Sequence, residues 1–236
     1  MDRRHFFQNS ALVTTGALVG CATPGFAAGA PKTPFAVPAT YIPIVGSDEM
    51  FPIRRIYCIG RNYAAHAREM GSDPTREPPF FFQKPTDAIQ YVAAGTVANH
   101  PYPTLTKNYH YEAELVAVLG KGGRNISVDK ALDLVYGYTL GLDMTVRGVE
   151  ERSYRKSPDS YTVLGPAFVT ADEIKDPHAL TMSLWVNGER RQHSSTGAMT
   201  VDIPDLIEFA LRSRLAVLDQ EHAAIVNIKP VAGGKG

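Results

Sequence analysis

The stretch His110-Tyr-Glu-Ala-Glu-Leu115 constrains this chain most, because it puts two carboxylates, Glu112 and Glu114, two residues apart. The residues that follow, VAVLGKGGRN, are rich in Val and Leu and predict a strand that ends in a glycine turn. Residues two apart in a strand point to the same face, so the two carboxylates lie side by side. A cation stabilises such a pair, and a solvated strand face is the alternative interpretation of an isolated pair.

A third carboxylate, Asp143, occurs in a second predicted strand, YGYTLGLDMT. Three oxygen ligands with open positions suit Mg²⁺ or Mn²⁺, whereas Zn²⁺ prefers His or Cys ligands. Spacing alone does not bring the two strands together, so the metal site is a hypothesis at this point.

Composition limits the partners. The chain has 236 residues, enough for one core of good size, and we expect a single catalytic domain. Lys plus Arg (24) balance Asp plus Glu (24), so no net charge favours nucleic acid or an anionic membrane, and a small-molecule partner is expected. Only two cysteines occur, which excludes a disulfide framework.

The first thirty residues have the layout of an export signal of the twin-arginine type: a basic start, a short apolar run and a small-residue end. The apolar run is too short to span a bilayer permanently. Leu18-Val19-Gly20-Cys21 resembles a lipoprotein cleavage box, which would attach a lipid to Cys21; ordinary cleavage within 27–30 is the alternative we favour. We expect an exported, periplasmic protein, and a frayed helix of a cytoplasmic enzyme is the competing interpretation.

Residues 31–50 form a predicted proline-rich lead-in, and residues 51–236 form the catalytic domain. Helical spacing in NYAAHAREM puts His66 and Glu69 three residues apart, so both side chains lie on one helix face. The segment RGVEERSYRKSPDS is highly charged and is expected to be mobile. Further predictions are a strand pair joined at Asn187-Gly188 and a helix over IPDLIEFAL.

Several long motifs, taken in order, resemble the fumarylacetoacetate hydrolase superfamily, in particular its acylpyruvase and fumarylpyruvate hydrolase branch. They are YCIGRNYAAHAREMG, EPPFFFQKPTDAI, HYEAEL, YGYTLGLDMT, KSPDSYTVLGP and WVNGERRQ, and the resemblance runs from about Ile42 to Phe209. It implies an α+β, mostly β fold with a rolled mixed sheet and few helices, a homodimer, and a divalent metal, Mg²⁺ or Mn²⁺.

The resemblance also assigns residues to roles. It implies metal ligands at Glu112, Glu114 and Asp143, and a water-activating pair at His66 and Glu69. It implies an active-site lysine at Lys156 and three substrate contacts, at Arg61, Gln83 and Lys84.

The expected reaction is hydrolysis of a C–C bond in an acylpyruvate-type β-diketo acid, such as fumarylpyruvate, to pyruvate and a carboxylic acid. His66, oriented by Glu69, would act as general base, and Lys156 would offset charge on the developing oxyanion. A 2-oxo acid decarboxylase, hydratase or isomerase on the same scaffold is an alternative that needs no water activation. A non-catalytic remnant of such an enzyme is the third interpretation of the sequence.

The resemblance ends after Phe209, and residues 210–236 are an atypical tail that lacks the family's closing motifs. We expect the C-terminal strands of the sheet to be missing, with an exposed sheet edge and weak or no turnover.

Overall fold

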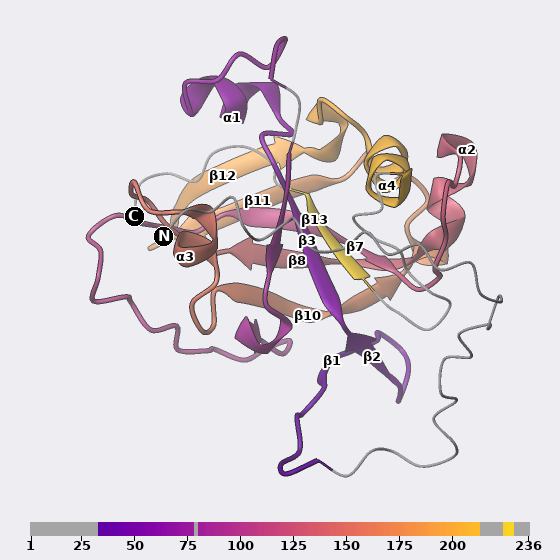
Figure 1. The fold of residues 1–236 in the computed structure, drawn as a ribbon, viewed down its shortest axis with the longest axis horizontal. Coiled ribbons are helices and arrows are strands. Elements are labelled where there is room, and N and C mark those ends of the chain that lie inside the picture. The colour runs from indigo at the N-terminus through magenta and orange to yellow at the C-terminus, as the bar shows by residue number, and fades with distance from the viewer. Residues whose placement is uncertain (1–32, 78–79, 213–223, 229–236) are drawn as a thin grey trace, which may run out of the picture. The chain divides into compact units, whose positions relative to one another are not determined.

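The structure is a computed structural model that describes residues 33–77, 80–212 and 224–228 (Figure 1). The compact unit that carries the strands begins at Pro38. Strand β1 (Thr40–Pro43) pairs antiparallel with β2 (Met50–Ile53). The predicted lead-in 31–50 therefore contains the first strand of the unit, and the boundary predicted at residue 51 lies too late.

A mixed sheet of seven strands organises the fold, in the order β4-β3-β13-β7-β8-β10-β5. The bounds are β3 Arg55–Gly60, β4 Phe80–Lys84, β5 Ile89–Tyr91, β7 Ala113–Leu119, β8 Val135–Asp143, β10 Thr162–Thr170 and β13 Ala224–Ile228. The pairs β13–β3 and β10–β5 are parallel, and the other pairs are antiparallel. This agrees with the mostly β, mixed fold that the resemblance implied.

The atypical tail supplies an interior strand. In β13, Ala224 is opposite both Arg55 of β3 and Leu119 of β7, so the tail joins the two strands through backbone hydrogen bonds on both sides. The prediction that the tail leaves a sheet edge open is wrong at this position. Backbone hydrogen bonding depends little on side-chain identity, so a tail without the expected motifs can still pair as a strand.

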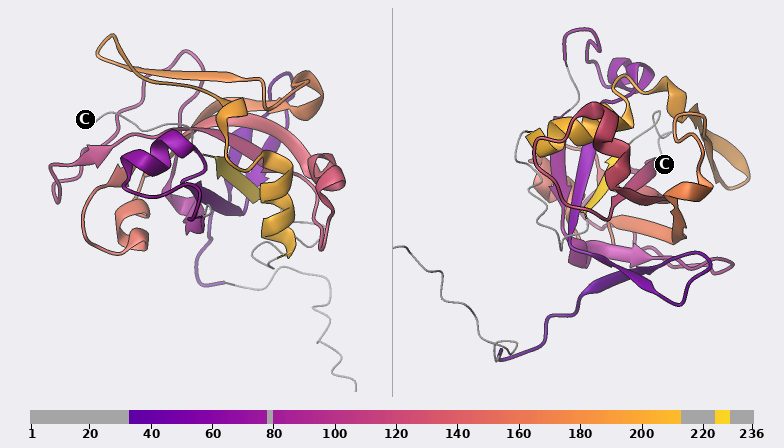
Figure 2. Two further views of the ribbon diagram at one scale, coloured as in Figure 1. Left: turned by 90° about the horizontal axis from the view of Figure 1, so that it is seen from above. Right: turned by 90° about the vertical axis from the view of Figure 1, so that its right-hand side faces the viewer.

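Alternation along the strands gives the sheet two apolar faces. On one face, Tyr57, Ile59 and Leu115 belong to a cluster with the buried stripe of α4 (Ile203–Arg212), which is Ile203, Leu206, Ile207 and Leu211. On the other face, Cys58, Val116 and Val118 pack with the β1–β2 hairpin and Phe168. Figure 2 shows α4 and this hairpin on different sides of the central strands.

The remaining elements are short. They are α1 Ala64–Glu69, α2 Val128–Ala131, α3 Arg152–Lys156, the two-stranded ribbons β6 Tyr109–His110 with β9 Thr145–Val146 and β11 Thr181–Val186 with β12 Glu189–Ser195, and 3-10 turns at Thr86–Ala88, Leu132–Leu134, Ala171–Glu173 and Thr196–Ala198. Asn187 and Gly188 connect β11 to β12 with φ values of 51° and 80°, so the predicted hairpin turn is confirmed. The helix predicted over IPDLIEFAL is confirmed as α4.

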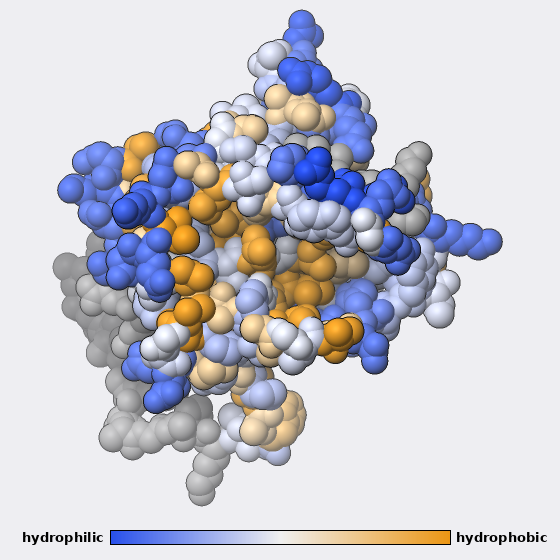
Figure 3. Space-filling view, turned by 180° about the vertical axis from the view of Figure 1, so that it is seen from behind, coloured by the Kyte–Doolittle hydropathy of each residue, from blue (hydrophilic) through white to orange (hydrophobic). Residues whose placement is uncertain are grey.

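The charged segment that follows Asp143 differs from its prediction. Residues 147–160, predicted as a mobile loop, contain the helix α3 and directly follow β9, and Lys156 at the end of α3 is buried. Elsewhere hydrophobic and hydrophilic residues separate on the surface: in the view from behind, apolar side chains gather at the middle of the face with hydrophilic ones around them (Figure 3).

In the part of the chain that the structure describes, no helix is both long and apolar enough to cross a membrane. The predicted export signal and the lipidation of Cys21 fall on residues 1–30, which lie outside the described residues.

Candidate metal centre and active site

The three predicted carboxylates meet at one end of the sheet. Glu112 immediately precedes β7, Glu114 lies in β7, and Asp143 ends β8. The antiparallel register brings them together, because Ala113 faces Leu142 and the Asp143 N–H donates to the Glu112 carbonyl at 2.8 Å. One oxygen from each carboxylate lies within 4.8 Å of the others, and all three residues are at most 1% exposed.

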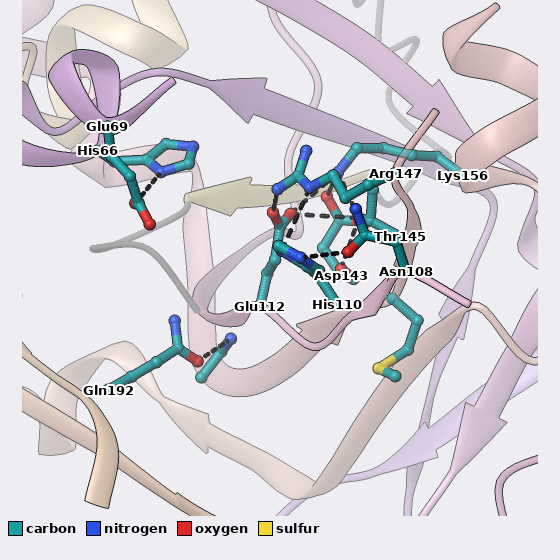
Figure 4. A network of polar contacts seen from close by, with 12 residues as sticks. His66, Glu69, Asn108, His110, Glu112, Asp143, Thr145, Arg147, Lys156 and Gln192 are labelled. Atoms are coloured by element: carbon teal, nitrogen blue, oxygen red, sulfur yellow. Dashed lines mark hydrogen bonds and ion pairs between the residues drawn. The ribbon is translucent and has the colours of Figure 1, made fainter. Parts of the chain in front are cut away.

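Three cationic side chains contact two of these carboxylates, and Figure 4 shows two of the three, Arg147 and Lys156. Lys156 donates to Glu112 Oε2 at 3.0 Å and also to Asp143 Oδ2, and Arg147 forms an ion pair with Glu112 Oε1. Lys84 donates to Asp143 Oδ1 at 2.5 Å. Burial of unpaired charge is very costly, so these contacts explain how the carboxylates can be buried together.

The charge on Lys156 is secured by the same carboxylates. Burial by itself would lower the pKa of Lys156, but Asp143, Glu112 and Glu114 outweigh it and raise the pKa well above its usual value. The Lys156 ammonium therefore stays protonated at neutral pH, as a fixed positive charge beside the carboxylates.

The donor set fits a hard divalent cation. Three buried carboxylates that converge from two strands supply oxygen ligands only, as Mg²⁺ and Mn²⁺ prefer, and no His or Cys joins them in the cluster found among the described residues. The site is thus able to hold one divalent metal through Glu112, Glu114 and Asp143.

The predicted His66 and Glu69 pair lies on α1. His66 Nδ1 is 3.6 Å from Glu69 Oε2, and the spacing of three residues brings the two side chains to one helix face. His66 is only 5% exposed, whereas the Glu69 side chain is 50% exposed. In Figure 4 the pair is set apart from the carboxylate cluster, with the second ring nitrogen turned away from Glu69.

A small cavity of about 100 Å³ joins these groups. His66 and the three carboxylates line it, and so do Lys156 and Arg61. Glu69 does not line it and reaches the cavity only through its contact with His66. The structure therefore brings together six of the nine residues that the sequence predicted for the site around one cavity.

Two of the three predicted substrate contacts, Gln83 and Lys84, do not line the cavity. Lys84 and Gln83 are neighbours in β4, so their side chains point to opposite faces. Gln83 is exposed and does not line the cavity. Lys84 is buried and donates to Asp143 and to the carbonyls of Met144 (3.2 Å) and Tyr161 (2.6 Å), so it supports a carboxylate rather than reaching the cavity.

The sequence reasoning missed Thr145 and Arg147. Thr145 Oγ1 accepts from Lys156 at 2.9 Å, and Arg147 lines the cavity beside Glu112. Both follow Asp143 at intervals of two residues in extended chain, the same alternation that pairs Glu112 with Glu114. Continuing that alternation past Asp143 would have found them.

Residues 55–219 match the family described as fumarylacetoacetate (FAA) hydrolase C-terminal. The chain belongs to the fumarylacetoacetate hydrolase family. The matched range holds all nine residues proposed for the site and most of the seven-stranded sheet.

Two curated relatives illustrate the range of activities in this family. The chain is 46% identical over 129 residues to a maleylpyruvate hydrolase from Aquipseudomonas alcaligenes, a match that covers 55% of this chain and 44% of that enzyme. It is 40% identical over 174 residues to a mitochondrial oxaloacetate tautomerase from Bos taurus, with coverage of 71% and 76%.

Among solved structures, a fumarylpyruvate hydrolase from Pseudomonas aeruginosa in complex with Mn²⁺ and pyruvate has a TM-score of 0.77 at 41% identity, covering 83% of this chain and 85% of that chain. Since that relative was crystallised with Mn²⁺, it agrees with a divalent-metal site in this family.

Proposed function

We propose that this chain is a metal-dependent hydrolase that cleaves a C–C bond in acylpyruvates, yielding pyruvate and a carboxylic acid. The observation that carries the proposal is the nearly buried His66, which shares one small cavity with three converging carboxylates. A group able to activate water beside a site able to hold a divalent metal is what hydrolysis of a β-diketo acid requires. The hydrolases that the chain resembles support the same reaction class.

The metal ligands would be Glu112, Glu114 and Asp143, and a divalent metal bound there supplies a Lewis acid for a 2-oxo acid. His66 Nδ1 faces Glu69, so we assign Nε2 as the atom that takes a proton from water. The water oxygen then bonds to the keto carbon remote from the substrate carboxylate. Lys156, held charged by its neighbours, offsets negative charge on the substrate oxygens.

The C–C bond next to that carbon breaks, and its electron pair remains on the carbon that becomes the methyl group of pyruvate. The proton held by His66 goes to this carbon, and the second proton of the water leaves with the carboxylic acid. The roles of His66, Glu69 and Lys156 are thus base, positioning residue and fixed charge.

The alternative is decarboxylation or tautomerisation of a 2-oxo acid such as oxaloacetate, and the similarity to an oxaloacetate tautomerase favours it. These reactions share the metal site but consume no water in the bond-breaking step. His66 is therefore the residue that separates the two functions.

The test follows the ultraviolet absorbance of acetylpyruvate, and separately of oxaloacetate, with Mn²⁺ and either the parent protein or His66→Ala. Loss of a general base lowers kcat by about 10²–10⁴-fold, so acetylpyruvate hydrolysis should nearly vanish in His66→Ala. His193→Ala on β12, where the side chain is exposed, is the matched control. Oxaloacetate turnover that survives in His66→Ala, with no acetylpyruvate hydrolysis by the parent, would establish the alternative; metal without protein gives the background rate.

We further propose that the chain is exported and forms a homodimer, on the basis of residues 1–30 and of the family resemblance. Fractionation of cells that express the full chain tests export, and light scattering after gel filtration tests the dimer. A cytoplasmic full-length product would contradict export, and a monomer at assay concentration would contradict the dimer.

Weak turnover caused by the atypical tail also remains a prediction. Although β13 occupies the sheet and the family match runs to residue 219, residues 210–236 lack the closing motifs that the resemblance led us to expect. We expect a variant with those motifs restored to turn over acylpyruvate faster than this chain, and equal rates would contradict the prediction.

A further inference from the structure

The cavity beside the carboxylates has an excess of positive charge. Its lining includes three carboxylates and five cationic residues, which are Arg61, Arg147, Arg152, Arg155 and Lys156. Arg147 and Lys156 contact the carboxylates from the cavity, and Lys84 contacts Asp143 from outside it. These three cations already balance the charge of the three carboxylates. The remaining arginines therefore add charge that the triad does not need.

Most of these cations have polar partners within the protein. Arg147 and Lys156 contact Glu112, Arg61 forms an ion pair with Glu77, and Arg155 Nε donates to the Glu150 carbonyl at 2.8 Å. Arg152 differs, because it makes no hydrogen bond or ion pair with any residue that the structure describes. Among the five cations, Arg152 is the one with neither a hydrogen bond nor an ion pair within the described chain; Arg155 has only its hydrogen bond to a carbonyl, and Glu151 is the opposite charge that acts on Arg152.

Aromatic rings hold Arg152 in place. Its guanidinium carbon lies 4.0 Å from the centre of the Phe80 ring and 5.8 Å from that of Phe82. Partial burial, followed by the charges of Arg155 and Arg61, lowers the pKa of Arg152 from its usual value. A stacked guanidinium that is disfavoured by burial and by like charges is ready to accept an anion, and its planar fork matches a carboxylate.

Arg152 also lies at a suitable place relative to the triad. It begins α3 and Lys156 ends it, so the two are four residues apart and share one helix face. Both approach the same ring, with Lys156 Nζ 4.8 Å from the centre of Phe82. The backbone positions of Arg152 and Lys156 are separated by about one helical turn, about 6 Å along the axis.

We propose that Arg152 binds a carboxylate at the far end of the acyl group, which makes it a specificity-determining residue for acylpyruvates whose acyl part is itself a dicarboxylic acid. This inference rests on the proposed function, because the keto-acid end of the substrate is assigned to the triad and Lys156. A substrate that reaches from the triad to Arg152 along the cavity then has a cation at each end, while a short or methyl-ended acyl group leaves Arg152 without an anion.

The test compares two substrates that differ only at this end. Fumarylpyruvate ends in a carboxylate, and crotonylpyruvate has a methyl group in its place. Charge-assisted hydrogen bonds contribute about 10–100-fold, so the parent protein should favour fumarylpyruvate in kcat/KM by about that factor. Arg152→Leu should bring the ratio of the two kcat/KM values close to one by raising KM for fumarylpyruvate. The kcat/KM for crotonylpyruvate should change by less than about twofold.

Arg76→Leu is the matched control, because its side chain is 84% exposed and does not line the cavity. If Arg152 had a purely structural role, Arg152→Leu would lower kcat/KM for both substrates by the same factor, and this result would overturn the proposal. An equal preference for both substrates in the parent protein would also overturn it, while leaving acylpyruvate hydrolysis intact.

A binding measurement keeps the two proposals separable. Calorimetric titration of the metal-loaded protein with fumarate and with crotonate should show tighter binding of fumarate, and Arg152→Leu should remove the difference. If neither substrate is hydrolysed, the proposed function fails, and the titration still decides whether Arg152 binds the second carboxylate. Equal affinities for fumarate and crotonate would overturn that role.

Discussion

Two cavities of this protein differ in size and in chemistry. The larger, about 690 Å³, is lined mainly by apolar residues of β8, β10 and β11 and of the chain after β5; its polar members are Gln90, His100 and Ser183. The smaller, about 100 Å³, is lined by three carboxylates, five cations and His66. The largest apolar pocket is the usual first choice for a binding site, but buried, mutually perturbed charges mark catalytic chemistry more directly.

The comparison of the two cavities shows that the fold retains buried charge at the smaller one. In the smaller cavity, each contact between Lys156 or Arg147 and a carboxylate offsets part of the desolvation of both groups, so the cluster needs its members together. The larger cavity has no comparable set of charges and makes no such demand. We therefore expect substitutions at the smaller cavity to change chemistry and those at the larger one to leave it nearly unchanged.

The largest expected effect is on the metal ligands. Glu114→Gln removes one carboxylate, and because even residues that only support metal ligands contribute 10–100-fold, we expect metal affinity and kcat/KM to fall by at least about 100-fold. Calorimetric titration with Mn²⁺ and the acylpyruvate assay measure both. Glu49→Gln, the same change at an exposed residue, is the control. Unchanged Mn²⁺ affinity in Glu114→Gln would contradict the assignment of the metal site to the triad.

Metal removal should stop activity and leave the protein folded, because Lys84, Lys156 and Arg147 already neutralise buried carboxylates. At about 100 times its dissociation constant a ligand stabilises the folded state by about 2.7 kcal/mol. For a chain of this size that raises the thermal midpoint by about 5–10 °C. Calorimetric scans with Mn²⁺ and with chelator measure the shift; global unfolding on chelation would contradict the expectation, and Glu114→Gln should show no shift.

A pair of variants compares the two cavities directly. Phe80→Leu removes the ring under Arg152 in the smaller cavity, and the loss of a cation–π contact should lower kcat/KM for fumarylpyruvate by about 2–5-fold. Leu140→Ala trims a half-exposed side chain of the larger cavity and should change kcat/KM by less than about twofold. A larger loss in Leu140→Ala than in Phe80→Leu would reverse the assignment of the two cavities.

The smallest effect concerns pH at the larger cavity. His100 lies within hydrogen-bond distance of Gln90 Oε1 (2.7 Å) and Tyr109 OH (2.5 Å), and burial, then the charge of Lys84, lowers its pKa. Below about pH 6.5 the unfolded chain binds a proton that the folded chain resists, so the free energy of unfolding should fall as pH falls. Urea unfolding at pH 7.5 and pH 5 measures this.

His100→Gln should reduce the pH dependence, since an amide can replace a neutral imidazole as donor and acceptor but does not titrate. His193→Gln, at an exposed histidine, should keep the parent's dependence. Equal pH dependence in His100→Gln and the parent would mean that other groups titrate instead.

Local patterns in the sequence predicted much of the site. The spacing of Glu112 and Glu114 and the helical spacing of His66 and Glu69 depend on strand and helix geometry alone, and both are observed. The stripe of α4 and the turn at Asn187 and Gly188 likewise follow from periodicity and turn chemistry. The sequence pattern suggested Asp143 as a third ligand, but the family resemblance was needed to connect it to the pair and to add Lys156.

The sequence by itself thus determined the two local pairs, the strand and helix periods and the family. Tertiary structure decided which neighbour of a pair faces inward, so that Lys84 is buried on Asp143 while Gln83 is exposed. It also decided that the charged segment after Asp143 folds back to place Arg147 and Lys156 on Glu112, and that the tail forms β13 between β3 and β7. These contacts join residues far apart in the chain, and their free energy depends on burial and charge pairing, which no local pattern encodes.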